Sequence, residues 1–147
     1  MPEHGQTPPL RDGRCAFAVV DGPRWVSLTG RAVAVEDPAV GLVTGSVRLG
    51  DRPDVVNAAG NPMHWLGYTW AGGMGEPAAE HAQARDVTCI SGATFAVRRR
   101  VWEALGGFDP EYFAYGEDVD LSLRTWQRGL RVRYEPAAVS FHHYEFS

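Results

Sequence analysis

The 147-residue sequence predicts a single α/β domain. Short apolar runs typical of buried strands alternate with stretches in which apolar residues recur at helical spacing. Glycine and proline separate these stretches, as they do at turns and helix ends. A chain of this length has room for one hydrophobic core. We therefore expect one α/β sandwich, in which helices pack on a sheet.

The first part of the chain predicts a disordered lead-in, a strand and a helix. Residues 1–14 are rich in proline, glycine and charge, which leaves 15–147 as the folded part. An apolar run at 15–20 predicts a buried strand, and Asp21 lies at its end, where α/β proteins often carry functional groups. Helical spacing over 25–35 predicts a short helix that ends before a proline.

The middle of the chain predicts two strands around a long irregular segment. The pattern at 40–49 predicts a strand entered directly from the preceding helix. Residues 51–86 are aromatic and glycine-rich without a sustained period, and long loops in compact domains are usually functional or disordered. Residues 85–97 predict a buried strand interrupted at Ser91-Gly92. A glycine within a strand often marks the close approach of a ligand or another backbone.

The last third predicts two helices and two extended runs. Residues 99–105 predict a helix capped by Gly106-Gly107. A second helix begins near residue 117 and stops at Gly129. One face of it would carry the apolar side chains Val119, Leu123, Trp126 and Leu130. Residues 131–134 then predict a strand ended by Glu135-Pro136, and 138–144 form another extended run that contains two histidines.

Three carboxylates, Glu117, Asp118 and Asp120, lie at the start of the second predicted helix. Acidic side chains at this end are stabilised by the helix dipole, and Asp118 as an N-cap would be ordinary. The segment before them is aromatic and bracketed by glycines, which a cap alone does not need. The helix alone therefore favours capping, and the preceding segment argues for a functional cluster instead.

Composition excludes several classes of function. The net charge is −4 and the basic residues are scattered, which argues against a nucleic-acid partner. Cys15 and Cys89 stand far apart, so we expect a reducing compartment and no disulfide scaffold. No leader and no apolar run near the roughly 20 residues of a membrane span is present, so we expect a soluble segment.

A divalent metal is a further hypothesis from the residues. His142 and His143 end the last extended run, and histidines beside carboxylates are reasonable ligands for a divalent cation. Carboxylates at a helix start and a histidine near a chain end are each commonplace on their own. The residues alone leave both readings open.

An ordered series of motifs resembles the C-terminal half of a family 2 glycosyltransferase. The resemblance covers about residue 39 to the end, is densest over 87–143, and is nearest to rhamnosyltransferase-like and galactofuranosyltransferase-like members. Its motifs are Ser91-Gly92-Ala93, Arg98-Arg99, Gly106-Gly107-Phe108-Asp109, Phe113, Gly116 to Arg124, Gly129, Pro136 and His142.

The resemblance implies a partial GT-A fold, a three-layer sandwich that lacks most of the N-terminal nucleotide-binding half. It implies transfer of a sugar, with inversion, from a nucleotide-sugar donor to a glycan or polyprenyl-linked acceptor. Asp118 would be the general base, and Mg²⁺ or Mn²⁺ would be held by His142 or His143, with Asp21 as a remnant of the family's Asp-x-Asp motif. The implied substrate-binding residues are Ser91, Gly92, Phe108, Asp109, Tyr115, Glu117, Asp120 and Trp65.

The chain departs from the family pattern at its beginning. No Asp-x-Asp motif precedes Trp25. We therefore expect residues 15–147 to act as part of a longer enzyme, in the cytoplasm or at the inner face of the membrane. One alternative is a catalytically silent fragment or a module that binds glycans or proteins. Another is a metal-dependent hydrolase that uses Asp118 and His142, which would need a metal site without Asp-x-Asp.

Overall fold

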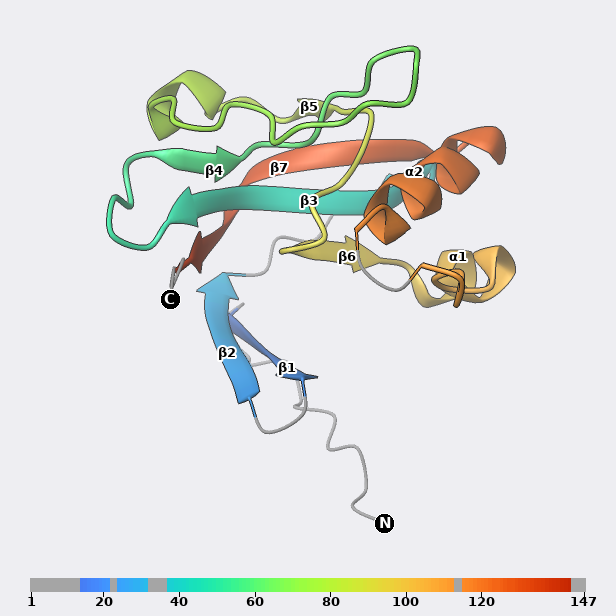
Figure 1. Cartoon of the computed structure of the whole chain (residues 1–147), viewed down its shortest axis with the longest axis horizontal. Helices are drawn as coiled ribbons and strands as arrows, with labels where there is room; N and C mark the ends of the chain where they lie inside the picture. The colour runs from blue at the N-terminus through green and yellow to red at the C-terminus, as the bar shows by residue number, and fades with distance from the viewer. Residues whose placement is uncertain (1–13, 22–23, 32–36, 113–114, 144–147) are drawn as a thin grey trace.

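A computed structural model describes residues 14–21, 24–31, 37–112 and 115–143, with side chains from residue 37 onward. It contains short and long strands, two α-helices and one 3₁₀ turn (Figure 1). In chain order these are β1 (Arg14–Asp21), β2 (Arg24–Arg31), β3 (Val40–Leu49), β4 (Val56–Ala58), η1 (Ala78–His81), β5 (Arg85–Asp86), β6 (Phe95–Val97), α1 (Arg99–Leu105), α2 (Glu117–Gln127) and β7 (Arg131–His142). The predicted α/β class is confirmed.

The main sheet is mixed and has β3 and β7 at its centre. Its order is β4-β3-β7-β5, with β3 and β7 parallel and β5 antiparallel to β7. β6 and β4 both run antiparallel to β3 and pair with its first and second halves. Figure 1 shows α1 and α2 beside the end of the sheet where β3 and β7 begin. None of the helices described is long and apolar enough to cross a bilayer.

The N-terminal part differs from the prediction. β1 and β2 form an antiparallel hairpin whose register runs from Arg14↔Arg31 to Asp21↔Arg24. The predicted strand and its end at Asp21 are confirmed, but the helix predicted over 25–35 is wrong where the chain is described. Helical spacing in a short apolar stretch is ambiguous, and cross-strand pairing overrides it here. Residues 1–13 of the predicted lead-in and 32–35 lie outside the described residues.

The prediction for the C-terminal strand is wrong at one point. β7 does not end at Glu135-Pro136 but continues as one strand to His142. Its pairing with β3 steps from Gly45↔Glu135 to Ser46↔Val139, so extra residues of β7 bulge opposite Gly45. Proline has no N–H to donate to the ladder, which explains why the irregularity includes Pro136. A Cβ on Gly45 would lie 2.3 Å from the carbonyl oxygen of Ala138.

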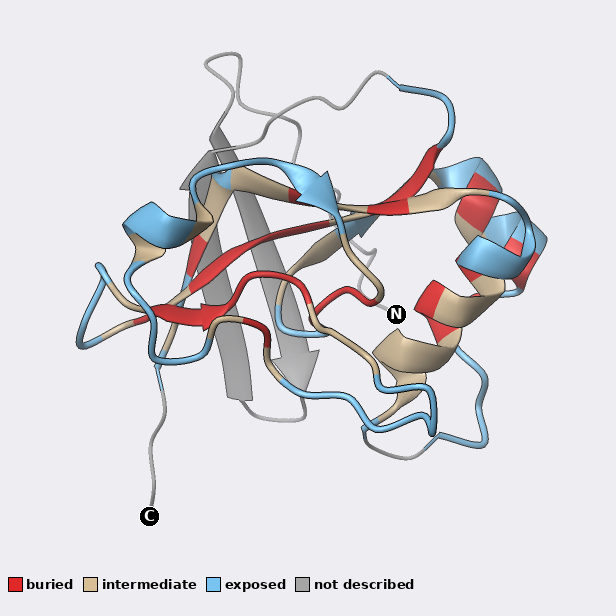
Figure 2. Ribbon diagram, turned by 90° about the horizontal axis from the view of Figure 1, so that it is seen from above, coloured by how far each residue is buried: buried red, intermediate tan, exposed pale blue. Residues whose placement is uncertain are grey.

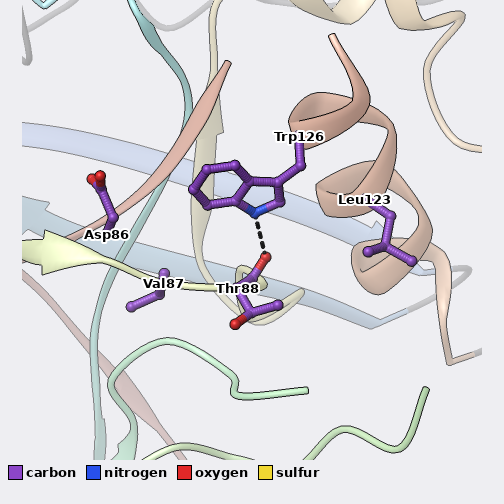
Figure 3. A pocket seen from close by; sticks show the side chains of 5 residues that line it. All are labelled: Asp86, Val87, Thr88, Leu123 and Trp126. Atoms are coloured by element: carbon purple, nitrogen blue, oxygen red, sulfur yellow. Dashed lines mark hydrogen bonds between the residues drawn. The ribbon is translucent and has the colours of Figure 1, made fainter. Parts of the chain in front are cut away.

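α2 buries one leucine and two hydroxyl side chains against the rest of the protein. Leu121, Ser122 and Thr125 are its buried residues, and Leu121 joins the core cluster with Leu42, Ile90, Val101, Leu105 and Val132. The buried face of α2 is therefore rotated about the helix axis from the face that the sequence predicted. Figure 3 shows Leu123 and Trp126 lining an open pocket with Asp86, Val87 and Thr88, where the indole N–H of Trp126 donates to the Thr88 carbonyl at 2.9 Å.

The long segment between β3 and β6 is irregular, as predicted, although it contains three short elements. Predicted as one buried strand, residues 85–97 instead form β5, β6 and a connection between them. The connection carries the fully buried Cys89 and Ile90, whereas β5 is exposed. Burial raises the pKa of the Cys89 thiol to about 11, so the thiol stays protonated at neutral pH. Figure 2 shows the buried residues along the central strands and the inner sides of the helices.

Asp37 joins the beginnings of β3 and β7. Its carboxylate accepts the Ala39 N–H at 2.9 Å and pairs with Arg131, which also contacts Asp86 at 3.2 Å. The Ala39 N–H, followed by the charge of Arg131, lowers the pKa of Asp37 below 3.8. Folding therefore favours the charged form of Asp37 over the protonated form.

We expect Asp37→Asn to weaken the acid sensitivity of the fold. Because the native pKa of Asp37 is depressed, its contribution to the free energy of unfolding is present above about pH 4 and is lost as the pH falls through the native value. Urea denaturation of the native chain and the variant from pH 7 to pH 3 measures this difference. The two curves should converge toward low pH. A constant separation across the range would exclude the linkage.

Candidate functional site

The connection between β5 and β6 is fixed by three consecutive backbone N–H groups. Ile90 donates to Ser122 Oγ at 3.1 Å, Ser91 donates to Thr44 Oγ1 at 3.2 Å, and Gly92 donates to Asp118 Oδ2 at 2.9 Å. Thr44 is a fully buried residue of β3, and the other two acceptors belong to α2. The connection is thereby held between the sheet and the first turns of α2.

Asp118 is the acidic residue that this arrangement positions. Its Oδ1 accepts its neighbour Val119 N–H at 2.8 Å, while Oδ2 accepts the Gly92 N–H. The N-cap of α2 is Gly116, with φ 96° and no side-chain cap, so Asp118 lies inside the first turn. The N-terminal end of a helix favours a negative charge there. The two hydrogen bonds fix the orientation of the Asp118 carboxylate. The residue is half-buried, so part of it stays accessible to a ligand.

Because Gly92 has no side chain, the connection between β5 and β6 can lie close against α2. A Cβ at this position would lie 3.3 Å from both Asp118 Oδ2 and Glu117 Oε1. The sequence predicted that a ligand or another backbone approaches Gly92 within a strand. In the structure Gly92 lies in the connection between β5 and β6, and the neighbours of the missing side chain are these two carboxylates. Glu117 Oε2 is buried and, within the described parts of the chain, has no hydrogen-bond partner. A buried carboxylate oxygen without a partner is unusual in a folded protein, and contact between Glu117 and substrate stays a prediction.

Asp120 faces the other helix. It pairs with Arg124, whose Nε lies 2.8 Å from Asp120 Oδ2. The same guanidinium donates to the carbonyls of Leu105 at 2.6 Å and Gly107 at 2.8 Å. Asp120 and Arg124 thus connect α2 to the C-terminal end of α1. Asp118 and Glu117 remain as the carboxylates beside Gly92, and contact between Asp120 and substrate stays a prediction.

The aromatic segment before α2 leads up to the carboxylates. Phe108 contacts Trp102 edge-on at 5.1 Å between ring centroids, and Asp109 Oδ1 accepts the Glu111 N–H at 2.9 Å. Tyr115 has φ 65° and is 92% exposed, immediately before Gly116. A left-handed backbone at a bulky residue is an outlier, and such strain clusters at functional sites. Phe108, Asp109 and Tyr115 stay predictions as acceptor contacts.

Two of the three predicted metal ligands, His142 and His143, lie at the end of β7 and just after it. His142 Nδ1 lies 3.3 Å from Asn57 Oδ1, and burial, with the neighbouring His143, lowers the pKa of His142. His143 is exposed and its ring covers Gly50. Asp21 ends β1, and its side chain lies outside the described atoms. Among the described residues, no three His, Cys, Asp or Glu side chains lie together to hold a metal ion. Because the Asp21 side chain is not among them, His142, His143 and Asp21 stay a prediction as metal ligands.

Trp65, the remaining predicted substrate residue, lies on an exposed turn of the 51–86 segment. Sequence reasoning assigned no role to Thr44, Ser122 or Arg124. Arg124 and Ser122 belong to the acidic motif, so its spacing was the signal that could have found them. A lone threonine in a buried strand gives no such signal.

We expect Ser122→Ala to destabilise the fold by about 1–3 kcal/mol, because the buried Ile90 N–H would lose its acceptor. Ser122 Oγ also donates to the Asp118 carbonyl at 2.6 Å, so the change loosens the connection from the turn that carries Asp118. Thr125→Val is the matched control, since Thr125 Oγ1 bonds only its own helix, at Leu121 O. Equal urea midpoints for the two variants would contradict this role.

Several known proteins are similar to this chain in sequence. The chain is 44% identical over 59 residues to an N-acetylglucosaminyl-diphospho-decaprenol L-rhamnosyltransferase of Mycobacterium tuberculosis, and 40% identical over 57 residues to the rhamnosyltransferase WbbL of Escherichia coli. These matches cover 40% and 39% of the chain. The O-antigen biosynthesis protein RfbC of Myxococcus xanthus is 33% identical over 131 residues, which cover 85% of the chain.

The fold also has a solved counterpart. A crystal structure of GalNAc-T7 with UDP, GalNAc and Mn²⁺ matches with a TM-score of 0.58 and 16% identity, over 76% of this chain and 23% of that one. This likeness confirms the partial GT-A fold. The chain spans between 10% and 22% of the length of the curated relatives it matches. Residues 27–145 match the family model for glycosyltransferase like family 2, and the chain belongs to this family.

Proposed function

We propose that the chain forms the acceptor-side part of an inverting glycosyltransferase, with Asp118 as the general base. The observation that carries the proposal is the bond from the Gly92 N–H to Asp118 Oδ2. It fixes the carboxylate at the start of α2, next to the glycine that keeps the approach open. Family membership supports transfer of a sugar as the reaction class.

The reaction is a single displacement. An acceptor hydroxyl attacks the anomeric carbon of the donor sugar, and the bond from that carbon to the nucleoside diphosphate breaks. The hydroxyl proton passes to a carboxylate oxygen of Asp118, and the electron pair of the broken bond leaves with the diphosphate. The Gly92 and Val119 N–H groups orient Asp118 for this transfer. A divalent cation would stabilise the negative charge that develops on the leaving diphosphate, and His142, His143 and Asp21 are the residues proposed to hold it.

Donor and acceptor follow from the names of the relatives. Two of them are rhamnosyltransferases, and one of these is named for a diphospho-decaprenol acceptor. We therefore propose a nucleotide-activated deoxyhexose as the first donor to test and a polyprenyl-diphosphate glycan as the first acceptor. The reaction would take place at the cytoplasmic face of the membrane. The relatives are several times longer, so we propose that the donor-binding part lies elsewhere in a longer enzyme.

The direct test is a transfer assay on the full-length form with radiolabelled nucleotide-sugar donors and a polyprenyl-diphosphate sugar. The expected result is label in the lipid fraction. The assay should be run with and without Mg²⁺ or Mn²⁺, because the solved neighbour contains Mn²⁺. Acceptor binding without transfer for any donor would favour a binding module and overturn the proposal.

A further inference from the structure

We propose that the turn around Trp65 and Leu66 is a docking element for a phospholipid bilayer. The turn belongs to the segment between β4 and η1, which Figure 1 shows in green as a loop that projects from the protein. Trp65 is 83% exposed and Tyr68 is 71% exposed. Three more apolar side chains of the segment are exposed as well, and they are Leu66, Trp70 and Met74. Exposed apolar residues grouped in this way mark an interaction surface.

Charge favours lipid over a protein or polar partner. Charged residues make up 22% of the chain, yet residues 55–75 contain no Asp, Glu, Lys or Arg. A charged side chain is costly in the centre of a bilayer, and less so near its surface. Because the segment carries none, this cost does not arise. A loop exposed only to water would be better solvated with charged residues.

The backbone of the turn is prepared for an apolar surrounding. His64 N–H donates to the Tyr68 carbonyl at 2.7 Å, and Gly67 N–H donates to the His64 carbonyl at 2.8 Å. Leu66 N–H lies 3.3 Å from His64 Nδ1, and Met63 bridges to Thr69. Backbone groups without partners are costly inside a membrane. The N–H groups of His64, Leu66 and Gly67 are satisfied within the turn itself.

The residue types also suit a membrane surface. Tryptophan and tyrosine are enriched where a bilayer meets water, because each has an apolar body and a polar tip. Stacking on a sugar would use the same rings, but sugar hydroxyls also require polar side chains beside them. At the tip, His64 Nδ1 is already taken by Leu66, and Trp65 and Leu66 bring no hydroxyl, amide or carboxylate.

Sedimentation with vesicles tests the proposal without a donor or acceptor, so its outcome does not depend on the transfer reaction. Vesicles of pure phosphatidylcholine are used at low and high salt. We expect the 147-residue chain to sediment with them in both, because the contact is apolar. The double variant Trp65→Ser, Leu66→Ser should bind at least about tenfold more weakly, since two large apolar side chains would no longer leave water on binding.

The control is Phe141→Ser, which removes an exposed aromatic side chain of β7 outside this segment. It should bind vesicles as the unchanged chain does. Thermal unfolding checks that both variants are folded. Three results would overturn the proposal: no sedimentation of the unchanged chain, equal sedimentation of the double variant, or binding that high salt abolishes. Binding of soluble glycans that needs Trp65, without vesicle binding, would assign the turn to sugars instead.

Discussion

Asp118→Asn should lower the rate of sugar transfer by about 10²–10⁴-fold, the usual contribution of a general base. Asparagine has the shape of aspartate, and its carbonyl oxygen can still accept the Gly92 N–H. It cannot take a proton from the acceptor hydroxyl at neutral pH. The fold should therefore be retained while turnover is lost. Initial rates at saturating donor and acceptor measure the loss of turnover. Calorimetry of donor binding checks that the variant is still folded and binds its donor.

Asp51→Asn is the matched control for this variant. It makes the same chemical change at an exposed carboxylate on the turn after β3, where Asp51 pairs with the adjacent Arg52 at 3.9 Å. Its transfer rate should equal that of the unchanged enzyme. If Asp118→Asn keeps its turnover within about tenfold of the unchanged enzyme, proton transfer to Asp118 supplies too little of the rate for the assignment to stand.

Gly45→Ala should cost at least about 3 kcal/mol of folding stability, at the upper end of overpacking effects. The new Cβ would lie 2.3 Å from the Ala138 carbonyl oxygen. That oxygen belongs to the backbone of β7, which cannot move aside as a flexible side chain would. The bulge that carries β7 past Gly45 would have to shift along β3. Urea denaturation of the two proteins measures the change.

Gly75→Ala separates this clash from the general cost of replacing glycine. Gly75 has φ +84° and no atom near the position of an added Cβ. Its replacement should cost only the left-handed backbone penalty, about 1–2 kcal/mol. Gly75→Ala therefore measures the backbone penalty alone, and Gly45→Ala measures the steric clash. A Gly45→Ala protein as stable as Gly75→Ala would mean that the bulge of β7 adjusts freely.

The sequence predicted those elements whose signals are local. β3 shows as an apolar run between turns, and α1 ends at Gly106, which adopts the left-handed conformation expected of a C-terminal cap. The hairpin partner β2 was missed because a short apolar stretch fits both periods and only pairing with β1 decides between them. The continuity of β7 through Pro136 also depends on a distant strand, β3.

Two motifs that are separate in the sequence meet in the fold, whereas the contribution of one buried residue could not be predicted. Gly92 and the Glu117-Asp118 pair were separate motifs in the sequence, and the fold brings them into contact. The role of Thr44 depends on which backbone lies across β3, which the sequence does not encode locally. The proposed metal ligands stay a prediction, since they are not gathered in the described residues.

The stereochemistry of transfer tests the role of Asp118 most directly. With a full-length form, a nucleotide-sugar and an acceptor, proton NMR can follow the anomeric signal of the first product formed. If Asp118 acts as a base in a single displacement, the product has the opposite anomeric configuration from the donor. A product that retains the donor configuration would require a different course of reaction and would contradict the assignment.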